Sequence, residues 1–250
     1  MHTFVDVFNW LTDPAHWSGT DGIPLRVWQH VEISLVAVAI AAAVAIPVGL
    51  LVGHTRRFEF LAVSIANVGR AIPSFAVLVL AFVLVLDILP QSHKSLAFGF
   101  TPTVIALVLL AIPPIVTNTY VGIQAVDPDT VEAARGMGMS GREVLLRLEA
   151  PLAAPLAMAG LRTAAVTVVA TATLAALIGG GGLGRYIVDG LARGDTPMLV
   201  SGAVLVAILA IITELSFALL ERAVTPRTRS GRRRRAPRPG AEALPEAIRA

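Results

Sequence analysis

The sequence contains no cysteine, which excludes disulfide bonds and thiolate metal sites. Charge is also scarce: Asp, Glu, Lys and Arg make up 15% of the 250 residues, against roughly a quarter in soluble domains. The sole lysine is Lys94, and no Gly-Lys-Ser/Thr sequence occurs, so the chain lacks the P-loop that binds nucleotide phosphates. The five histidines are scattered without the spacing of metal ligands. We therefore expect no catalytic residue, no metal site and no cofactor in this chain.

Apolar residues, in contrast, make up 55% of the chain and gather into long runs. A helix needs about 20 apolar residues to cross the hydrocarbon core of a membrane. The runs that reach this length are 27–52, 60–89, 103–121, 151–178 and 198–220. The sequence therefore predicts an all-α membrane protein with about five transmembrane helices, which form one domain over residues 25–222.

The second run contains Pro73, and proline removes a helical hydrogen bond and kinks or breaks a helix. Two spans in place of one are excluded by length, because residues 60–72 are too few to cross a membrane alone. We therefore expect one bent helix over residues 60–89.

The positions of arginine set the expected orientation, because positively charged loops stay on the cytoplasmic side. With an external N-terminus, the cytoplasmic segments hold Arg56 and Arg57, three arginines between 135 and 147, and the arginines of the tail. We therefore expect the N-terminus outside and the C-terminus inside, with residues 1–24 as an external or interfacial segment. That segment lacks the basic start of a cleavable signal peptide and carries Trp10 and Trp17, which suit a lipid–water boundary.

Residues 223–250 form a tail rich in proline, arginine and alanine, which we expect to be disordered in the cytoplasm. Its arginine cluster at 232–235 either contacts anionic lipid or serves only as a topology anchor. Binding of nucleic acid is not expected, because the adjoining helix holds the tail at a membrane surface.

The loop over residues 127–151 is long and polar, although it joins two apolar runs. Asp127 is suited to the N-cap of a short helix, and Pro128 to its first position, where a missing N–H costs nothing. Gly136 and Gly138 then interrupt this helix, because glycine adopts positive φ without strain.

The second half of the loop carries a further helix start. Ser140 and Glu143 fit a capping box for a helix through Leu148, and Pro151 restarts the chain into the fourth span. We therefore expect a compact helix–turn–helix on the cytoplasmic surface. A membrane protein does not need such a structured connection merely to turn around, so we expect a cytoplasmic partner to bind it.

Five residues of this loop stand at a recognisable spacing: Glu132, Ala133, Ala134, Gly138 and Pro151. The spacing resembles the EAA loop of ABC importer permeases, whose pattern is EAA-x3-G-x9-I-x-L-P. The chain departs from the pattern only in apolar residues, with leucine at 148 and alanine at 150.

Three further stretches, at 69–80, 99–128 and 177–195, are similar to permeases of glycine betaine/choline/carnitine-type osmoprotectant importers. This resemblance covers most of residues 25–222. It implies the type I ABC importer permease fold, a multi-pass position in a bacterial cell membrane, and a non-catalytic pore subunit for glycine betaine or a related quaternary-ammonium compatible solute. The alternatives are a permease for methionine or another amino acid, and a stand-alone secondary transporter.

The resemblance also implies partners. Such importers contain ATPase subunits that hold ATP and magnesium, an external substrate-binding protein, and a second copy or paralogue of the permease. The EAA loop is the coupling helix that docks on the ATPase. The residues expected to couple are Glu132, Ala133, Ala134, Gly136, Gly138, Ser140 and Pro151.

Residues that place breaks or polar groups among the apolar runs are candidates for the translocation pathway: Pro73, Asn118, Tyr120, Arg162, Gly181 and Gly182. Arg162 belongs either to the pore or, as we expect, to an ion pair with Glu214, because charges at membrane depth are usually paired. Tyr120 either contacts the ligand or, as we expect, serves ordinary helix packing or an interface, since the chain has only one other tyrosine and shows no aromatic cage for a quaternary ammonium ion.

The stretch GGGGLG at 179–184 formally matches a dinucleotide-binding pattern. That pattern requires a preceding strand in a soluble βαβ unit, whereas a membrane helix precedes it here. The glycines therefore provide either a flexible external turn or a close approach of backbone near the outer mouth of the pore.

Overall fold

The computed structural model describes residues 2–57, 60, 64, 67–69, 71–90, 92–93, 95 and 98–224, so the predicted tail lies outside the description from residue 225 onward. Within these ranges the chain forms helices and no strand. The elements are α1 (His2–Thr12), η1 (Pro14–Trp17), α2 (Ile23–Thr55), α4 (Ser74–Ile88), α5 (Phe100–Gln124), α6 (Pro128–Gly136), α7 (Gly141–Glu143), the π-helical η3 (Val144–Glu149), α8 (Ala150–Thr171), η4 (Ala172–Ile178), α9 (Gly184–Arg193) and α10 (Thr196–Val224).

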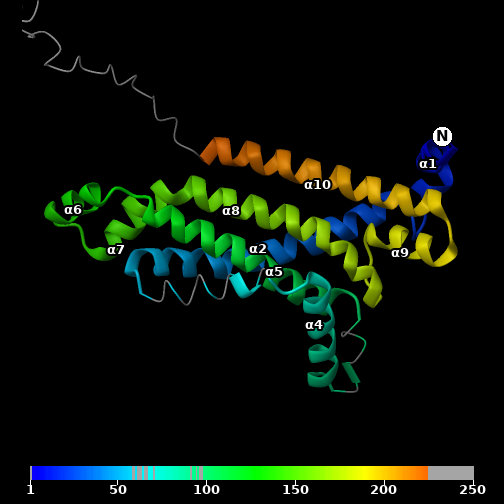
Figure 1. Ribbon diagram of the computed structural model, residues 1–250, viewed down its shortest axis with the longest axis horizontal. Coiled ribbons are helices and arrows are strands. Elements are labelled where there is room, and N and C mark those ends of the chain that lie inside the picture. The colour runs from blue at the N-terminus through cyan, green and yellow to red at the C-terminus, as the bar shows by residue number, and fades with distance from the viewer. Residues whose placement is uncertain are drawn as a thin grey trace, which may run out of the picture.

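Four helices in the described part of the chain are long and apolar enough to cross a membrane, namely Ile23–Thr55, Phe100–Gln124, Gly141–Ile178 and Thr196–Ala223. They run along the long axis of the molecule (Figure 1). Helices α6 and α7 lie at one end of this bundle, and α1 and α9 lie at the other (Figure 1). The predicted all-α membrane architecture is therefore confirmed.

A row of small residues lets α2 pack closely on α5. Its members recur at every fourth position of α2 and are all buried: Ala37, Ala41, Ala45, Gly49 and Gly53. A Cβ atom at Gly53 would lie 2.6 Å from the Cβ of Ile123, which is closer than real side chains approach. Small residues at this spacing are typical of helix contacts in membranes, where dispersion forces replace the hydrophobic effect.

The second apolar run differs from the single bent helix that the sequence predicts. Helix α4 begins at Ser74, and Pro73 has extended backbone with ψ 132°. Helical backbone is therefore interrupted at Pro73, and no continuous bent helix runs through this residue. Proline also disfavours helical backbone in the residue that precedes it. With 15 residues, α4 is shorter than the four long helices. It packs on α5 and projects steeply from the bundle axis (Figure 1).

The end of the loop also differs from the prediction. No new helix starts at Pro151, because α7, the π-helix and α8 form one continuous helix from Gly141 to Ile178. In the π-helix the N–H of Ala150 donates to the carbonyl of Leu145, five residues back. A proline in a regular helix removes a hydrogen bond and clashes with the carbonyl four residues back, and a widened turn before it accommodates the ring.

Candidate functional site

A cavity of about 610 Å³ lies between the start of α4 and the facing sides of α5 and α8. It is of the size of small-molecule sites in proteins. The residues that line it are Gly69, Ala71, Ile72, Pro73, Ser74, Leu110, Pro114, Asn118, Thr163, Thr167 and Thr171. Two of the predicted pathway residues, Pro73 and Asn118, are thus brought together at one site.

One wall of the cavity is a ladder of threonines on α8, spaced four residues apart so that they share a face. The hydroxyls of Thr163, Thr167 and Thr171 donate to the carbonyls four residues back, over 3.0, 2.8 and 2.7 Å. Each hydroxyl hydrogen is therefore used within the helix, and the oxygen lone pairs remain as acceptors. Our sequence reasoning missed this ladder, although its four-residue spacing within an apolar run was a usable signal.

The opposite wall comes from α5, where two prolines weaken the helix. Pro113 and Pro114 have no N–H, so the carbonyls of Leu109 and Leu110 lose their usual helical donors. The side-chain amide of Asn118 donates to the carbonyl of Pro114 over 2.8 Å. The wall thus carries the Asn118 side-chain amide on a helix that two prolines weaken.

None of the described residues that line the cavity is ionisable. Their polar side-chain groups are hydroxyls and an amide, which offer oxygen dipoles without a fixed charge. A passage must bind its solute well enough to admit it and weakly enough to release it. Uncharged oxygens meet both needs for a small polar solute.

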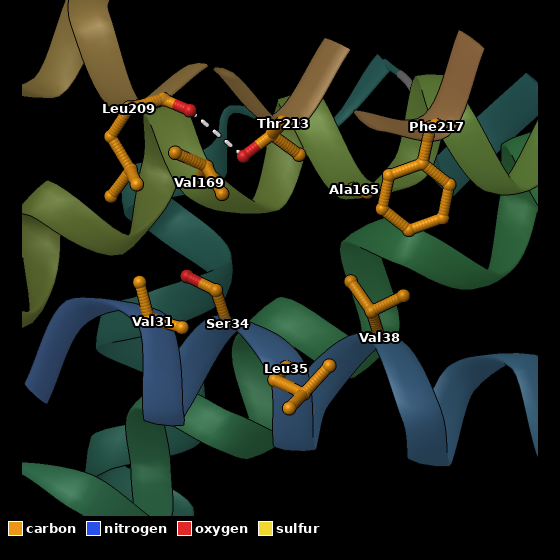
Figure 2. A pocket seen from close by; sticks show the side chains of 9 residues that line it. All are labelled: Val31, Ser34, Leu35, Val38, Ala165, Val169, Leu209, Thr213 and Phe217. Carbon is orange, nitrogen blue, oxygen red and sulfur yellow. Dashed lines mark hydrogen bonds between the residues drawn. The ribbon is translucent and has the colours of Figure 1, made fainter. Parts of the chain in front are cut away.

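A second cavity of about 120 Å³ provides a contrast. It lies between α2, α8 and α10, and its lining is apolar except for Ser34 and Thr213 (Figure 2). The Thr213 hydroxyl is bonded to the carbonyl of Leu209 over 2.8 Å. This space suits hydrocarbon rather than a polar solute.

The predicted caps of the 127–151 loop are confirmed. The N–H of Asp129 donates to the side chain of Asp127 over 2.9 Å, and Pro128 occupies the first turn of α6. Ser140 and Glu143 form the reciprocal capping box, in which the N–H of Ser140 donates to the Glu143 carboxylate over 3.0 Å. These local bonds make the loop a shaped body at the end of the bundle (Figure 1).

The loop exposes most of the residues that we expect to couple. Glu132, Ala133, Gly136, Ser140 and Pro151 are exposed, whereas Ala134 is buried. Gly138 has φ +91°, which favours glycine, and it ends the turn between α6 and α7. The side chain of Met137 beside it is 79% exposed.

Arg162 lies between α8 and α10, and it is not among the residues that line the large cavity. Its guanidinium pairs with Glu214 at 3.5 Å, as the sequence predicts, and also with Glu221 at 3.1 Å. Glu221 was missed because we ended the fifth run at residue 220. The signal was its spacing of seven residues from Glu214, which places both carboxylates on one face of a helix.

Tyr120 is buried within α5 and is also absent from the cavity lining. Its position agrees with the packing role that the sequence favours. The cavity therefore contains no aromatic side chain among its described residues.

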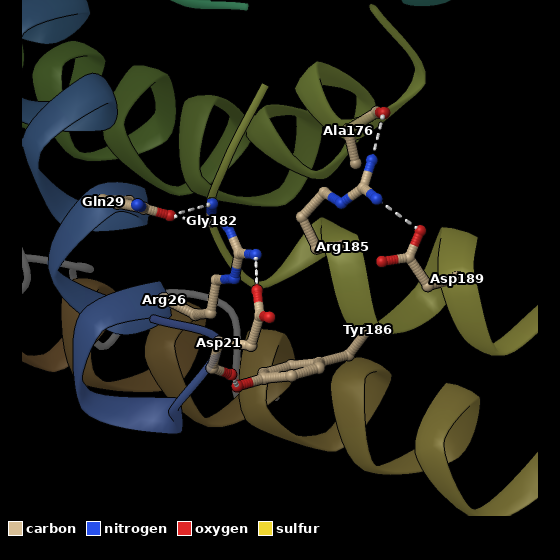
Figure 3. Close-up of polar contacts among 8 residues, drawn as sticks. All are labelled: Asp21, Arg26, Gln29, Ala176, Gly182, Arg185, Tyr186 and Asp189. Atoms are coloured by element: carbon tan, nitrogen blue, oxygen red, sulfur yellow. Dashed lines mark hydrogen bonds and ion pairs between the residues drawn. The ribbon is translucent and has the colours of Figure 1, made fainter. Parts of the chain in front are cut away.

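The glycine-rich stretch lies at the other end of the bundle from the loop. The N–H of Gly182 donates to the Gln29 side chain over 3.0 Å, and Gln29 also accepts from Arg26 (Figure 3). A Cβ at Gly181 would overlap the same Gln29 amide. The sequence left two roles open for these glycines, a flexible turn and a close approach of their backbone. The structure supports the close approach, here to the Gln29 side chain.

His30 fixes the same stretch from inside the bundle. Its Nε2 lies 2.8 Å from the carbonyl of Val169, and its Nδ1 accepts from the N–H of Leu183 over 3.3 Å. These partners define a neutral imidazole with its proton on Nε2. The histidine is fully buried, so it ties α2 to α8 and to the start of α9.

Tyr186 of α9 closes this end of the molecule. Its hydroxyl donates to the carbonyl of Asp21 over 2.5 Å, and the Asp21 side chain pairs with Arg26 (Figure 3). Burial raises the pKa of Tyr186 to about 12; the Arg26 charge acts against this shift and the Asp21 charge adds to it. The phenol is therefore held protonated as a hydrogen-bond donor.

Residues 45–230 match the family described as binding-protein-dependent transport system inner membrane component. The carnitine transport permease protein OpuCB of Listeria monocytogenes is 37% identical, over 81% of this chain and 88% of that protein. The choline transport system permease protein OpuBB of Bacillus subtilis is 38% identical, over 80% and 88%.

Among solved structures, an inward-facing form of the MetNI methionine ABC transporter is similar in fold. The TM-score is 0.73 with 22% identity, over 86% of this chain and all of that chain. At this identity the likeness concerns the fold alone. The extent of the family match and the identity to the curated permeases establish that the chain belongs to the binding-protein-dependent transport system inner membrane components.

Proposed function

We propose that the chain forms one half of the translocation pathway of an ABC importer for glycine betaine or a related quaternary-ammonium compatible solute. The observation that carries this proposal is the cavity of about 610 Å³, whose described lining residues are apolar or offer hydroxyl and amide oxygens without charge. A quaternary ammonium group has no N–H to donate, so it is attracted by the partial negative charge of hydroxyl and carbonyl oxygens. The names of the similar permeases, which refer to carnitine, choline and glycine betaine, support the same class of solute.

Family membership implies an ATPase and a substrate-binding protein as partners. We propose the finer composition of two ATPase subunits, which hold the ATP and magnesium, and a second permease copy or paralogue. The second permease would pack beside α4, where Leu80 is 65% and Val83 is 56% exposed. This contact would close the side of the cavity next to the start of α4.

The 127–151 loop would serve as the coupling helix. Closure of the ATPases around ATP would move the loops as rigid bodies, and the continuous helix from Gly141 to Ile178 would carry this motion into the threonine wall. The pathway would then open outward to receive the solute, and hydrolysis would return it to the inward state.

Uptake by the complete importer in proteoliposomes tests the substrate class. The permease, its ATPase and its binding protein are reconstituted, and uptake of radiolabelled glycine betaine, choline, carnitine and methionine is measured with and without ATP inside. We expect ATP-dependent uptake of at least one quaternary ammonium solute and none of methionine. Uptake of methionine alone would support the amino-acid alternative, and uptake by the purified chain without ATPase would refute the proposal.

A pair of threonine variants tests the cavity itself. Thr167→Val removes an acceptor oxygen from the cavity wall, and we expect the transport rate at low substrate to fall roughly 2- to 10-fold, as for loss of one hydrogen-bonding group. Thr213→Val is the matched control, because its hydroxyl makes the same four-residue bond but faces the apolar cavity of Figure 2. Equal effects of the two variants would contradict the assignment of the pathway.

A further inference from the structure

A buried polar contact joins the cytoplasmic end of α2 to the coupling loop. The Nδ1 of His54 lies 2.5 Å from the Oε2 of Glu149. The two side chains are only 17% and 8% exposed, so this contact is shielded from water. The residues are 95 positions apart in the sequence. A hydrogen bond to a carboxylate that is largely removed from bulk water is among the stronger contacts in proteins.

The π-helix explains why Glu149 faces inward. Val144 and Glu149, at its two ends, are both buried. In an α-helix five residues turn roughly 140° beyond one full turn, which would place these two on different faces. The wider turn of a π-helix brings residues five apart onto one face. The same bulge that accommodates Pro151 therefore directs Glu149 toward α2.

The pair lies beside a cavity that charged side chains of α2 and α6 also line, namely Arg56, Glu132 and Arg135. A cavity of about 320 Å³ lies between the ends of α2 and α5 and helix α6, and both His54 and Glu149 line it. A Cβ on Gly141 would lie 3.7 Å from the His54 Nε2, so the imidazole also sits beside the start of α7. The imidazole therefore lies beside Gly141 and bonds to Glu149 of the same continuous helix.

We propose that His54 and Glu149 are positioning residues that transmit movement of the coupling loop to α2. This inference rests on the proposed function. The loop is joined covalently to α5 and α8, whereas α2 follows it only through non-covalent contacts. The His54–Glu149 pair fastens α2 to the segment that moves, so that the three helices of the core respond together.

The test measures solute transported per ATP hydrolysed in the reconstituted importer, at matched amounts of assembled complex. In His54→Ala and Glu149→Gln we expect this ratio to fall about tenfold, the equivalent of one hydrogen bond to a charged group, while ATP hydrolysis continues. Ser216→Ala is the matched control. It also removes one hydrogen-bonding side chain, but this hydroxyl lies on α10, outside the coupling loop, and donates within its own helix to the carbonyl of Ile212 over 2.7 Å. Its ratio should equal that of the unaltered protein.

The exchanged pair, His54→Glu with Glu149→His, provides the rescue. We expect it to recover at least part of the ratio, because the hydrogen bond can re-form with its ends reversed. An unchanged ratio in the single variants would overturn the proposal, and so would a loss of assembled complex with a constant ratio, which indicates a purely structural role.

The proposed function is tested separately, by uptake of the solutes through the importer that contains the unaltered protein. If the unaltered importer transports none of the solutes, the substrate class is wrong. The pair is then judged by the stimulation of ATP hydrolysis by the binding protein, which the single variants should lose and Ser216→Ala should keep.

Discussion

The two ends of the helical bundle are held together in different ways. At the outer end, contacts cross long distances in sequence and involve backbone: His30 with Val169 and Leu183, and Gln29 with Gly182. At the cytoplasmic end, the loop is shaped by its own caps, such as the Ser140–Glu143 capping box, and the long-range hydrogen bond between His54 and Glu149 joins it to α2. The outer end is therefore built as a fixed unit. The loop is a preformed body with its own caps, which suits the proposed role of a part that moves on a partner.

The largest expected effect comes from breaking the fixed end. In Gly184→Ala the new Cβ would overlap the backbone carbonyl of Thr173, which cannot move aside as a flexible side chain can. We expect a loss of about 3 kcal/mol in unfolding free energy, at the upper end of typical overpacking. The midpoint of denaturant unfolding of the purified chain measures it.

Gly136→Ala is the matched control at the loop. Nothing lies within 4 Å of a Cβ at Gly136, which is the last residue of α6. We expect no loss of stability and a gain of up to about 1 kcal/mol from helix propensity. Equal destabilisation by the two alanines would show that the ends do not differ as described.

A smaller effect is expected from Arg162→Ala in the cytoplasmic half. The change removes the guanidinium that pairs with both Glu214 and Glu221, and these carboxylates lie on a helix expected to span the membrane. We expect a loss of about 2 kcal/mol and a lower yield of assembled complex, measured by co-purification with the ATPase. Relative uptake of the different solutes should stay the same, because Arg162 does not line the cavity. A normal yield with an altered solute preference would contradict this role.

Ser140→Ala tests the local shaping of the loop. It removes the N-cap oxygen that accepts from the N–H of Glu143 over 3.4 Å. Loss of such a cap costs about 1 kcal/mol. Because the cap is local, we expect fraying of α7 and a lower rate of transport, with little change in the unfolding midpoint of the bundle. Hydrogen exchange of residues 140–144 measures the fraying, and unchanged protection there would refute the role of the box.

The same difference between the ends decides what could be predicted from the sequence. The caps at Asp127, Ser140 and Glu143 depend on neighbours in the chain, and all were predicted and confirmed. The partner of Arg162 could be predicted in part, since helix length and depth limit the choice. The roles of Gln29 and His30 could not be predicted, because their partners lie about 140 to 150 residues away and are brought near only by packing.

Two local features were also missed, for a physical reason. The break at Pro73 and the π-helix before Pro151 are both responses to proline, and a sequence shows where a helix is disturbed but not how the disturbance is relieved. The chain breaks at Pro73, whereas at Pro151 the helix widens and continues. Packing of the flanking helices selects between these outcomes.

The smallest expected effect concerns the proton of Tyr186 at the outer end. Its pKa is raised from 10.0 to about 12, chiefly by burial. Below pH 10 the phenol is protonated in both the folded and the unfolded chain, so its contribution to stability is complete. As the pH rises from 10 to about 12 the unfolded chain releases this proton first, and the contribution is lost. We expect Tyr186→Phe to be less stable at neutral pH, because it lacks the hydrogen bond to Asp21. Between pH 9 and 11, Tyr186→Phe should also lose less unfolding free energy than the unaltered protein. If the unfolding free energies of the two proteins fall in parallel over this pH range, Tyr186 is not held protonated by the outer end.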